Sequence, residues 1–184
     1  FNLNGSTIFS SSIIIPSIKP YLWEAVINHY KSNTVYVEII FIGPKECNFP
    51  LPERVKFIKT DFKVAQCIEI GMQHATSFYL LQAADDTTIE GSSDPLGDIV
   101  RASNSFPDKI IGLGIAFNGR KLTNNQNCLV SNHPETNIPF CLVLTKDIIS
   151  QVGGYNANYI ASYVDVDLYL RILKLRLYLR RTRL

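Results

Sequence analysis

Apolar segments alternate with helical patterns along the first half of the chain, and this alternation limits the folds that are open to it. Segments rich in isoleucine, valine, leucine or phenylalanine predict strands at Ile8–Pro16, Val35–Ile42, Val55–Lys59 and Phe78–Ala84. Between them, apolar residues at helical spacing predict helices at Tyr21–Tyr30 and Val64–His74. Strands that alternate with helices form right-handed βαβ units, so we expect an α/β fold with a mostly parallel central sheet flanked by helices.

The second half of the chain continues this pattern less regularly. Its predicted elements are a helix from an Asp94 cap to Ala102, strands at Lys109–Phe117 and Pro139–Leu144, and helices at Lys146–Gln151 and Tyr163–Leu175. The polar stretch Leu122–Asn137 predicts a long loop of the kind that binds ligands or covers a site. The alternating tail Leu175–Arg180 predicts a half-buried strand.

Composition favours one domain with its own core. The chain has 184 residues, of which 46% are hydrophobic and 18% charged. Its apolar runs are far shorter than the roughly 20 residues that a membrane-spanning helix needs. The four cysteines have no C-x-x-C spacing, which argues against a zinc site. Cys67 and Cys141 lie in apolar patterns and predict buried thiols, which favours a reducing, cytoplasmic compartment.

The formal net charge of +2 is distributed unevenly. Residues 171–184 hold six basic residues and no acidic ones, so residues 1–170 have 12 basic against 16 acidic residues and a charge of −4. This balance predicts no nucleic-acid partner. We therefore divide the chain into a domain at 1–170 and a basic C-terminal segment at 171–184. That segment fits either peripheral contact with anionic lipid headgroups, at the inner face of a membrane, or the continuation of a longer chain.

Two adjacent carboxylates, Asp85 and Asp86, directly follow the predicted strand Phe78–Ala84. Ligands of parallel sheets bind beyond the carboxyl ends of the strands. Adjacent carboxylates repel each other unless a cation lies beside them, and hard cations such as Mg²⁺ or Mn²⁺ take oxygen ligands. From these residues alone, two interpretations stay open: a metal site and a solvated Asp-Asp turn.

A second group of charged side chains lies at Asp165, Asp167 and Arg171. On a helix, Asp165 and Asp167 point in different directions, whereas Asp167 and Arg171 stand at positions i and i+4 and can pair. The same stretch also fits an ordinary helix start, where acidic side chains favour the positive end of the helix dipole.

Four segments, taken in order, resemble those of family 2 glycosyltransferases with the GT-A fold, and the resemblance runs from about Ser10 to Leu173. The matching segments are S-I-I-I-P-S at Ser12–Ser17, E-I-I-F-I at Glu38–Ile42, a strand that runs into the D-D-x metal motif at Tyr79–Thr87, and the G-G turn of Lys146–Tyr155 followed by D-V-D-L-Y-L-R at Asp165–Arg171. All four in this order are more specific than any one alone.

This resemblance implies an inverting transfer of a sugar from a nucleotide-diphosphate donor to a hydroxyl of a glycan or another acceptor. It implies that Asp86 is the ligand of Mn²⁺ or Mg²⁺, that Asp85 contacts the donor's ribose or sugar, and that Asp165 is the general base. The other donor-binding residues that it implies are Pro16, Ser17, Gly43 and Lys63. Asp167, Arg171 and the loop histidine His133 are further candidate site residues.

The chain departs from the family's pattern after its second predicted strand. Gly43-Pro44-Lys45 stands where the family has an acidic turn that holds the nucleobase. Lys19, Lys45 and Lys63 are candidate contacts to the diphosphate, with ordinary surface lysines as the alternative. Two other functional classes stay open: a non-catalytic nucleotide- or sugar-binding module of the same fold, and a sugar nucleotidyltransferase. The second usually opens with a glycine-rich loop, and none follows Pro16.

Overall fold

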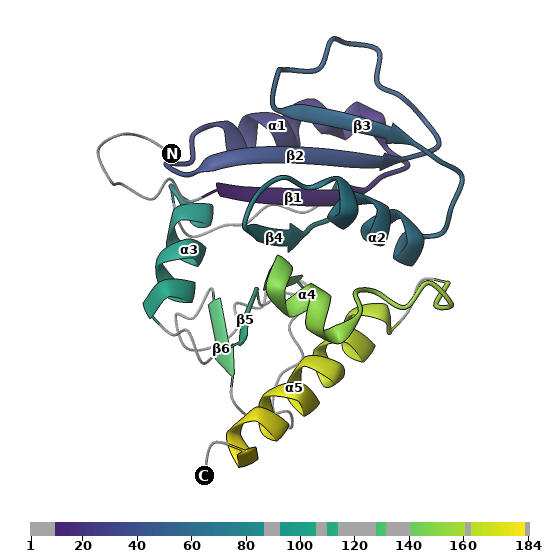
Figure 1. The fold of residues 1–184 in the computed structure, drawn as a ribbon. Helices are drawn as coiled ribbons and strands as arrows, with labels where there is room; N and C mark the ends of the chain where they lie inside the picture. Colours follow the sequence, from purple (N-terminus) through teal and green to yellow (C-terminus); the bar gives the residue numbers. More distant parts are fainter. Residues whose placement is uncertain are drawn as a thin grey trace, which may run out of the picture.

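The structure is a computed structural model that describes residues 10–86, 93–105, 110–113, 128–131, 141–160 and 163–182 (Figure 1). In these ranges the strands are β1 (Ser10–Pro16), β2 (Tyr36–Gly43), β3 (Val55–Lys59), β4 (Tyr79–Gln82), β5 (Ile110–Leu113), β6 (Cys128–Ser131) and β7 (Cys141–Thr145). The helices are a 3-10 turn η1 (Pro20–Leu22), α1 (Trp23–Lys31), α2 (Val64–His74), α3 (Pro95–Ser105), α4 (Lys146–Val152) and α5 (Val164–Thr182).

These strands form one sheet in the order β3-β2-β1-β4-β7-β5-β6. The first four are parallel: Ile15 of β1 lies beside Phe41 of β2, and Ile13 lies beside Leu81 of β4. β7 is antiparallel to both β4 and β5, and β6 is antiparallel to β5. The chain moves outward from β1 to β2 and β3 and then returns to add β4 on the other side of β1. The carboxyl ends of β1 and β4 are therefore the topological switch point of the sheet.

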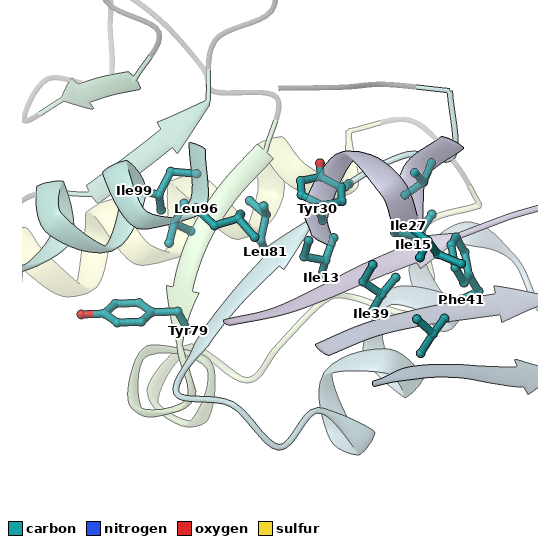
Figure 2. Close-up of a cluster of buried hydrophobic side chains, with 14 of the residues drawn as sticks. Ile13, Ile15, Ile27, Tyr30, Ile39, Phe41, Tyr79, Leu81, Leu96 and Ile99 are labelled. Atoms are coloured by element: carbon teal, nitrogen blue, oxygen red, sulfur yellow. The ribbon is translucent and has the colours of Figure 1, made fainter. Parts of the chain in front are cut away.

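Helices cover both faces of the parallel strands, which explains why these strands are almost wholly apolar. On one face, Ile13 and Ile15 pack in a cluster with Tyr30 of α1 and Leu96 of α3 (Figure 2). Ile14, between them in sequence, points to the opposite face. There it joins a second cluster, whose helical residues come mainly from α2 and α5. The predicted α/β fold, with a central sheet flanked by helices, is confirmed.

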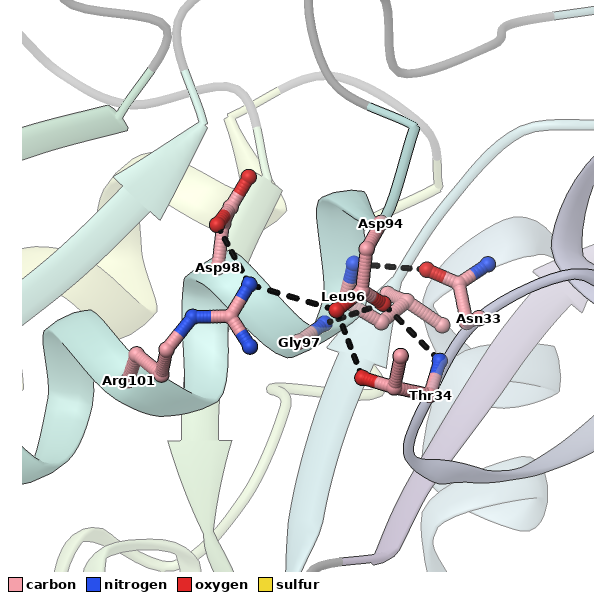
Figure 3. A network of polar contacts seen from close by, with 7 residues as sticks. All are labelled: Asn33, Thr34, Asp94, Leu96, Gly97, Asp98 and Arg101. Atoms are coloured by element: carbon pink, nitrogen blue, oxygen red, sulfur yellow. Dashed lines mark hydrogen bonds and ion pairs between the residues drawn. The ribbon is translucent and has the colours of Figure 1, made fainter.

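The predicted cap of α3 is also confirmed, and it ties two distant segments together (Figure 3). The Asp94 carboxylate accepts hydrogen bonds from the backbone N–H of Gly97 at 3.2 Å and from the backbone N–H and hydroxyl of Thr34. Arg101 forms ion pairs with Asp94 and Asp98. One carboxylate thus starts α3 and fixes it against the turn that follows α1.

Most predicted elements agree with the structure to within one to three residues. The strand at Val55–Lys59 and the helix at Val64–His74 agree residue for residue with β3 and α2. The helix predicted from Tyr21 begins instead with the 3-10 turn η1. β5 and β7 confirm the strands predicted around Ile110 and Leu142, whose outer residues lie partly outside the described ranges.

The prediction of one long loop over Leu122–Asn137 is wrong for residues 128–131. Cys128–Ser131 forms β6, in which Val130 lies beside Ile111 of β5. The apolar Cys-Leu-Val stretch is short enough to be hidden by the polar residues around it, and pairing with the neighbouring strand satisfies its backbone. The remaining residues of the predicted loop, His133 included, lie outside the described ranges.

The half-buried strand predicted at Leu175–Arg180 is also wrong, because α5 continues to Thr182. Upstream, Leu168 and Ile172 are buried in the second cluster and anchor the helix. A helix that has already formed gains one hydrogen bond for each added residue, so it overrides a six-residue alternation whose leucine and arginine residues, five of the six, are good helix formers. α5 also crosses the predicted division between residues 170 and 171. Within the described ranges, no helix has the length and hydrophobicity that a membrane span requires.

Candidate functional site

The two loops at the switch point bring the predicted donor-site residues together. Residues 17–19 follow β1, and residues 83–86 follow β4, its parallel neighbour. The backbone N–H of Ala83 donates to the carbonyl of Ile14, which keeps the pairing up to the last residues of the strand. Ser17, Lys19, Asp85 and Asp86 consequently lie at one point of the sheet edge, although 66 to 68 residues separate the bonded partners in sequence.

Asp85 is buried and held in place by two groups of the first loop. Its Oδ2 accepts a 2.6 Å hydrogen bond from the Ser17 hydroxyl and a 3.1 Å bond from the backbone N–H of Lys19. The indole Nε1 of Trp23 donates in turn to Ser17 Oγ at 2.7 Å. This chain from indole to hydroxyl to carboxylate fixes the loop after β1 against the loop after β4.

Gly43 supports the same loop from the other side. The backbone N–H of Ser17 donates to the carbonyl of Ile42 at 2.8 Å, which brings the ends of β1 and β2 together. A Cβ atom on Gly43 would lie 1.9 Å from the backbone oxygen of Ser17, so only glycine fits here. The predicted donor contact of Gly43 stays a prediction, but its packing role explains why glycine stands at this position.

Asp86 faces solvent and is paired with a lysine of the same chain. Lys19 Nζ lies 2.6 Å from Asp86 Oδ2, and the two side chains are 36% and 51% exposed. The hydrogen bond from Lys19 holds the pKa of Asp86 below its ordinary value, against the opposite effect of partial burial. The same bond raises the pKa of the Lys19 ammonium. Both groups are therefore charged at neutral pH.

The oxygen atoms at this edge fit a divalent cation that is bound together with a phosphate ligand. In the described part of the chain, no three His, Cys, Asp or Glu side chains are grouped to enclose a metal ion. Mg²⁺ sites often use only one or two carboxylates, with phosphate and water as the other ligands. Asp86 can supply such a carboxylate, and it already attracts a positive charge, the Lys19 ammonium. Metal binding by Asp86 stays a prediction that this set of donors supports.

The second group of predicted residues is organised by Arg171 in α5. Its guanidinium donates to Asp167 Oδ2 from Nε and Nη2, to the carbonyl of Val152 at 2.6 Å, and to the carbonyl of Gly154 at 2.7 Å. The predicted i,i+4 pair of Asp167 and Arg171 is thus confirmed. Gly153 and Gly154 have positive φ angles of 86° and 71°, which glycine adopts without strain. The turn at Gly153-Gly154 and the side chain of Arg171, which belong to the fourth matching segment, therefore form one structural unit that joins α4 to α5.

Asp165 and Asp167 have different surroundings, as their helical spacing predicted. Arg171 binds Asp167, whereas Asp165, half-buried in the first turn of α5, forms no side-chain hydrogen bond or ion pair with any residue that the structure describes. Tyr163, just before the helix, has a φ of 65°, and its carbonyl accepts the first backbone bond of the helix, from Asp167. Of the two aspartates, Asp165 is the one without a side-chain partner among the residues that the structure describes.

The turn before α5 is bound to the sheet close to the first carboxylate pair. The Tyr155 hydroxyl donates to Gln82 Oε1 at 2.6 Å, and its backbone N–H donates to Glu69 Oε2 of α2 at 2.9 Å. Gln82 is the last residue of β4, three positions before Asp85. The two groups of predicted site residues are thus connected through side-chain contacts, although no direct bond joins Asp165 to Asp85 or Asp86 in the described part of the chain.

Of the remaining predicted residues, Pro16 directly precedes Ser17, whereas Lys63 lies outside both groups. Pro16 is the last residue of β1, and the exposed Lys63 precedes α2, with its backbone N–H bonded to the side chain of Gln66. The sequence offered Lys19, with Lys45 and Lys63, as a candidate diphosphate contact, but it did not place Lys19 beside Asp86 or Trp23 beside Ser17. Their place within seven residues of the end of β1, the strand at the switch point, is the signal that could have found them.

Comparison with known proteins supports the fold. No protein-family model and no curated protein matches the sequence. Two solved structures of S. aureus TarS do match in three dimensions, one of residues 1–349. The first has a TM-score of 0.64 at 13% identity, and the second has 0.63 at 10%; each alignment covers 90% of this chain. The chain spans 55% of the first structure and 33% of the second. TarS is a GT-A-like glycosyltransferase, so the predicted GT-A-like fold is confirmed.

Proposed function

We propose that this protein is a metal-dependent, inverting glycosyltransferase of family 2. It would move a sugar, of the hexosyl type, from a nucleotide-diphosphate donor to a hydroxyl of a glycan or another acceptor, as in polysaccharide biosynthesis. The observation that carries this proposal is the pair Asp85 and Asp86 at the switch point of a GT-A-like sheet, with the first held by Ser17 and the second exposed. Ligands bind at such points in open α/β sheets.

On the donor side, one set of residues holds the site in shape and a different residue, Asp86, would bind the ligand. Ser17, Trp23 and the backbone of Lys19 hold the buried Asp85, and through it the end of β4. Asp86, next in sequence, is thereby presented to solvent at a fixed place. Asp86 would hold Mn²⁺ or Mg²⁺, which when bound supplies positive charge that offsets the negative charge of the departing diphosphate.

On the acceptor side, the proposal assigns the general base to Asp165. An inverting transfer needs a carboxylate that takes the proton of the acceptor hydroxyl as its oxygen attacks the anomeric carbon. Asp167 is a poor candidate because two nitrogen atoms of Arg171 bind its Oδ2. Asp165 has no such partner among the described residues, and Arg171 fixes the turn that precedes its helix.

A non-catalytic nucleotide- or sugar-binding module is the alternative, and one observation favours it. The end of β2 carries no carboxylate for a nucleobase: Gly43 packs against the backbone of Ser17, and the exposed Lys45 follows. A module of this kind would keep the metal and diphosphate contacts and lack transfer.

The experiment that decides is a turnover assay with a panel of nucleotide-diphosphate sugars, with and without Mn²⁺. Asp86→Ala should abolish metal-dependent turnover, and Asp165→Asn should lower it at least 100-fold, a typical contribution of general base catalysis being about 10²–10⁴. Asp147→Asn is the matched control, because Asp147 lies on the exposed start of α4.

Each other result has a clear meaning. Metal-dependent nucleotide binding that leaves every donor intact would favour the binding module. Absence of nucleotide binding, with and without metal, would rule out both functions. Turnover that survives in Asp165→Asn would remove Asp165 from the mechanism and leave the metal site in place.

The proposal also includes peripheral contact of the basic segment 171–184 with the inner face of a membrane. Positive side chains near an anionic surface each contribute about 1 kcal/mol. Sedimentation with vesicles of phosphatidylcholine alone and with vesicles that also contain anionic phosphatidylserine tests this contact. Equal sedimentation with both kinds of vesicle would contradict it.

A further inference from the structure

Lys19 binds both carboxylates at the switch point, each through a different group. Its backbone N–H donates to Asp85 Oδ2 at 3.1 Å, and its ammonium lies 2.6 Å from Asp86 Oδ2. The backbone contact belongs to the supporting network around Ser17. The ammonium contact does not, since Asp86 is exposed and, in the part of the chain that the structure describes, Lys19 is the one side chain bonded to it. The side chain of Lys19 can therefore leave Asp86 without disturbing Asp85.

The ion pair is placed where the proposed function requires a cation with two positive charges. An ammonium at 2.6 Å from Oδ2 occupies one of the coordinating positions of Asp86 and repels a second cation. The pair is also weak, because both side chains are about one third to one half exposed. Exposed pairs contribute roughly 0–1 kcal/mol, so a stronger partner for either group would break it.

We propose that the Lys19 side chain changes partner during donor binding: it neutralises Asp86 in the free protein, and it moves to the diphosphate when the donor arrives. This inference rests on the proposed function and adds a coupling between its two ligands. A diphosphate carries more negative charge than one carboxylate, and several of its oxygen atoms can accept hydrogen bonds from an ammonium. Its arrival removes Lys19 from Asp86 and frees that carboxylate for the divalent cation.

The coupling has a thermodynamic consequence that can be measured without turnover. Metal alone must displace Lys19 from Asp86 and therefore binds weakly. In the presence of a diphosphate, Lys19 has already left Asp86, so the metal binds more tightly. Because linkage is reciprocal, the metal must strengthen diphosphate binding by the same factor. Lys19 is thus a positioning residue that favours binding of the diphosphate before the metal. The cation is retained while the diphosphate is present and is released when the diphosphate leaves.

The test measures Mn²⁺ affinity of the 184-residue chain by electron paramagnetic resonance, first with Mn²⁺ alone and then with saturating UDP or GDP. Lys19→Met should tighten binding of Mn²⁺ alone about three- to tenfold, since one repelling charge and one weak pair are removed. In the same variant, the gain in Mn²⁺ affinity on adding the diphosphate should shrink by a similar factor. Lys19→Arg keeps the charge and should behave like the wild-type chain.

Two controls separate this effect from general changes. Lys31→Met removes one exposed positive charge at the far end of α1 and should leave Mn²⁺ affinity unchanged. Asp86→Ala should abolish Mn²⁺ binding in the wild-type and Lys19→Met backgrounds. Circular dichroism of each variant verifies that the fold is kept.

The failure of this inference is distinct from the failure of the proposed function. Equal Mn²⁺ affinities for wild type and Lys19→Met, with turnover of a sugar donor intact, would overturn the inference and leave the transferase. Mn²⁺ binding that persists in Asp86→Ala would overturn the inference and the assignment of the metal ligand. Absence of Mn²⁺ binding in every chain, with or without diphosphate, would overturn the inference together with the metal-dependent function.

Discussion

The Tyr155 hydroxyl donates a 2.6 Å hydrogen bond to Gln82 Oε1, and this contact links the turn before α5 to the strand that ends at the carboxylate pair. Tyr155 is buried, so its hydroxyl has little access to water as a substitute partner. The bond therefore couples the position of the helix that carries Asp165 to the position of β4.

Replacing Tyr155 with phenylalanine tests the strength of this link. Tyr155→Phe keeps the ring and removes the bond, and leaves Gln82 without its donor, so we expect a loss of about 1–2 kcal/mol in the free energy of unfolding. Urea denaturation measures it. Tyr159→Phe, at a half-buried ring in the same turn, is the control and should cost less than about 0.5 kcal/mol. Equal losses in the two variants would contradict the link.

Gly43 should tolerate no side chain without harm to the site. In Gly43→Ala, the new methyl group meets the backbone oxygen of Ser17, and relief requires the loop that holds Asp85 to move. We expect a loss of about 1–3 kcal/mol in unfolding free energy and a clear loss of nucleotide affinity by calorimetry.

The matched control for this prediction is Gly71→Ala. The added methyl group there meets the side chains of Ile14 and Ile42 in the second cluster, and not the backbone of the loop that holds Asp85. It should lower stability by a similar amount and leave nucleotide affinity unchanged in the folded protein. If both variants lose affinity equally, the effect of Gly43 on the site is no more than general destabilisation.

Arg171 should not be replaceable by lysine. Its planar guanidinium reaches Asp167 and the carbonyls of Val152 and Gly154 at the same time, and a single ammonium does not reproduce this geometry. We expect Arg171→Lys to lose about 1–3 kcal/mol in chemical denaturation. Arg101→Lys, which changes an exposed arginine in ion pairs with Asp94 and Asp98, should lose less than about 1 kcal/mol. A smaller loss at Arg171 than at Arg101 would refute the prediction.

Glu38 should make the stability of the protein depend on pH. Burial raises the pKa of this carboxyl, but hydrogen bonds from Lys56, Ser12 and the backbone of Thr76 outweigh it, and the net shift is downward from 4.5. A group with a lowered pKa stabilises the fold above its unfolded pKa, and that stability is lost as the pH falls through the folded pKa.

The variant Glu38→Gln checks this pH dependence. At pH 7 it should be less stable than the wild-type chain by about 1–3 kcal/mol, because Lys56 loses its charged partner. Toward pH 3 the difference should shrink, since Glu38 itself becomes protonated in the wild type. Urea unfolding at both pH values measures the difference, with Glu46→Gln as an exposed control. A difference that stays constant with pH would contradict the assignment to ionised Glu38.

The sheet could be predicted from the sequence because its parallel strands are apolar on both faces. Ile13, Ile14 and Ile15 are all buried, so this apolar stretch predicts a strand even when the strands that pair with it are unknown. The tail after Leu175 could not be predicted in the same way. Its alternation fits a strand and a helix equally well, and the helix that enters it from Val164 decides between them.

The sequence singles out the two carboxylates of the candidate site, but not the contacts that hold them in place. Asp85 and Asp86 stand out because charged residues follow an apolar strand. Lys19 and Trp23 do not, because their importance depends on pairing between β1 and β4, which brings together loops more than 60 residues apart. Sequence reasoning from one chain finds residues with unusual local surroundings, and it misses those whose role arises from contact across the sheet.

Trp23 is the only tryptophan of the chain. Its indole is shielded from water, stacked on Phe41 with ring centroids 4.2 Å apart, and bonded to the hydroxyl that binds Asp85. Every photon of tryptophan fluorescence that this protein emits therefore comes from one ring, two hydrogen bonds from the carboxylate. A ligand that shifts Ser17 alters the electric field at that ring, so the chain contains its own optical sensor for events at the switch point.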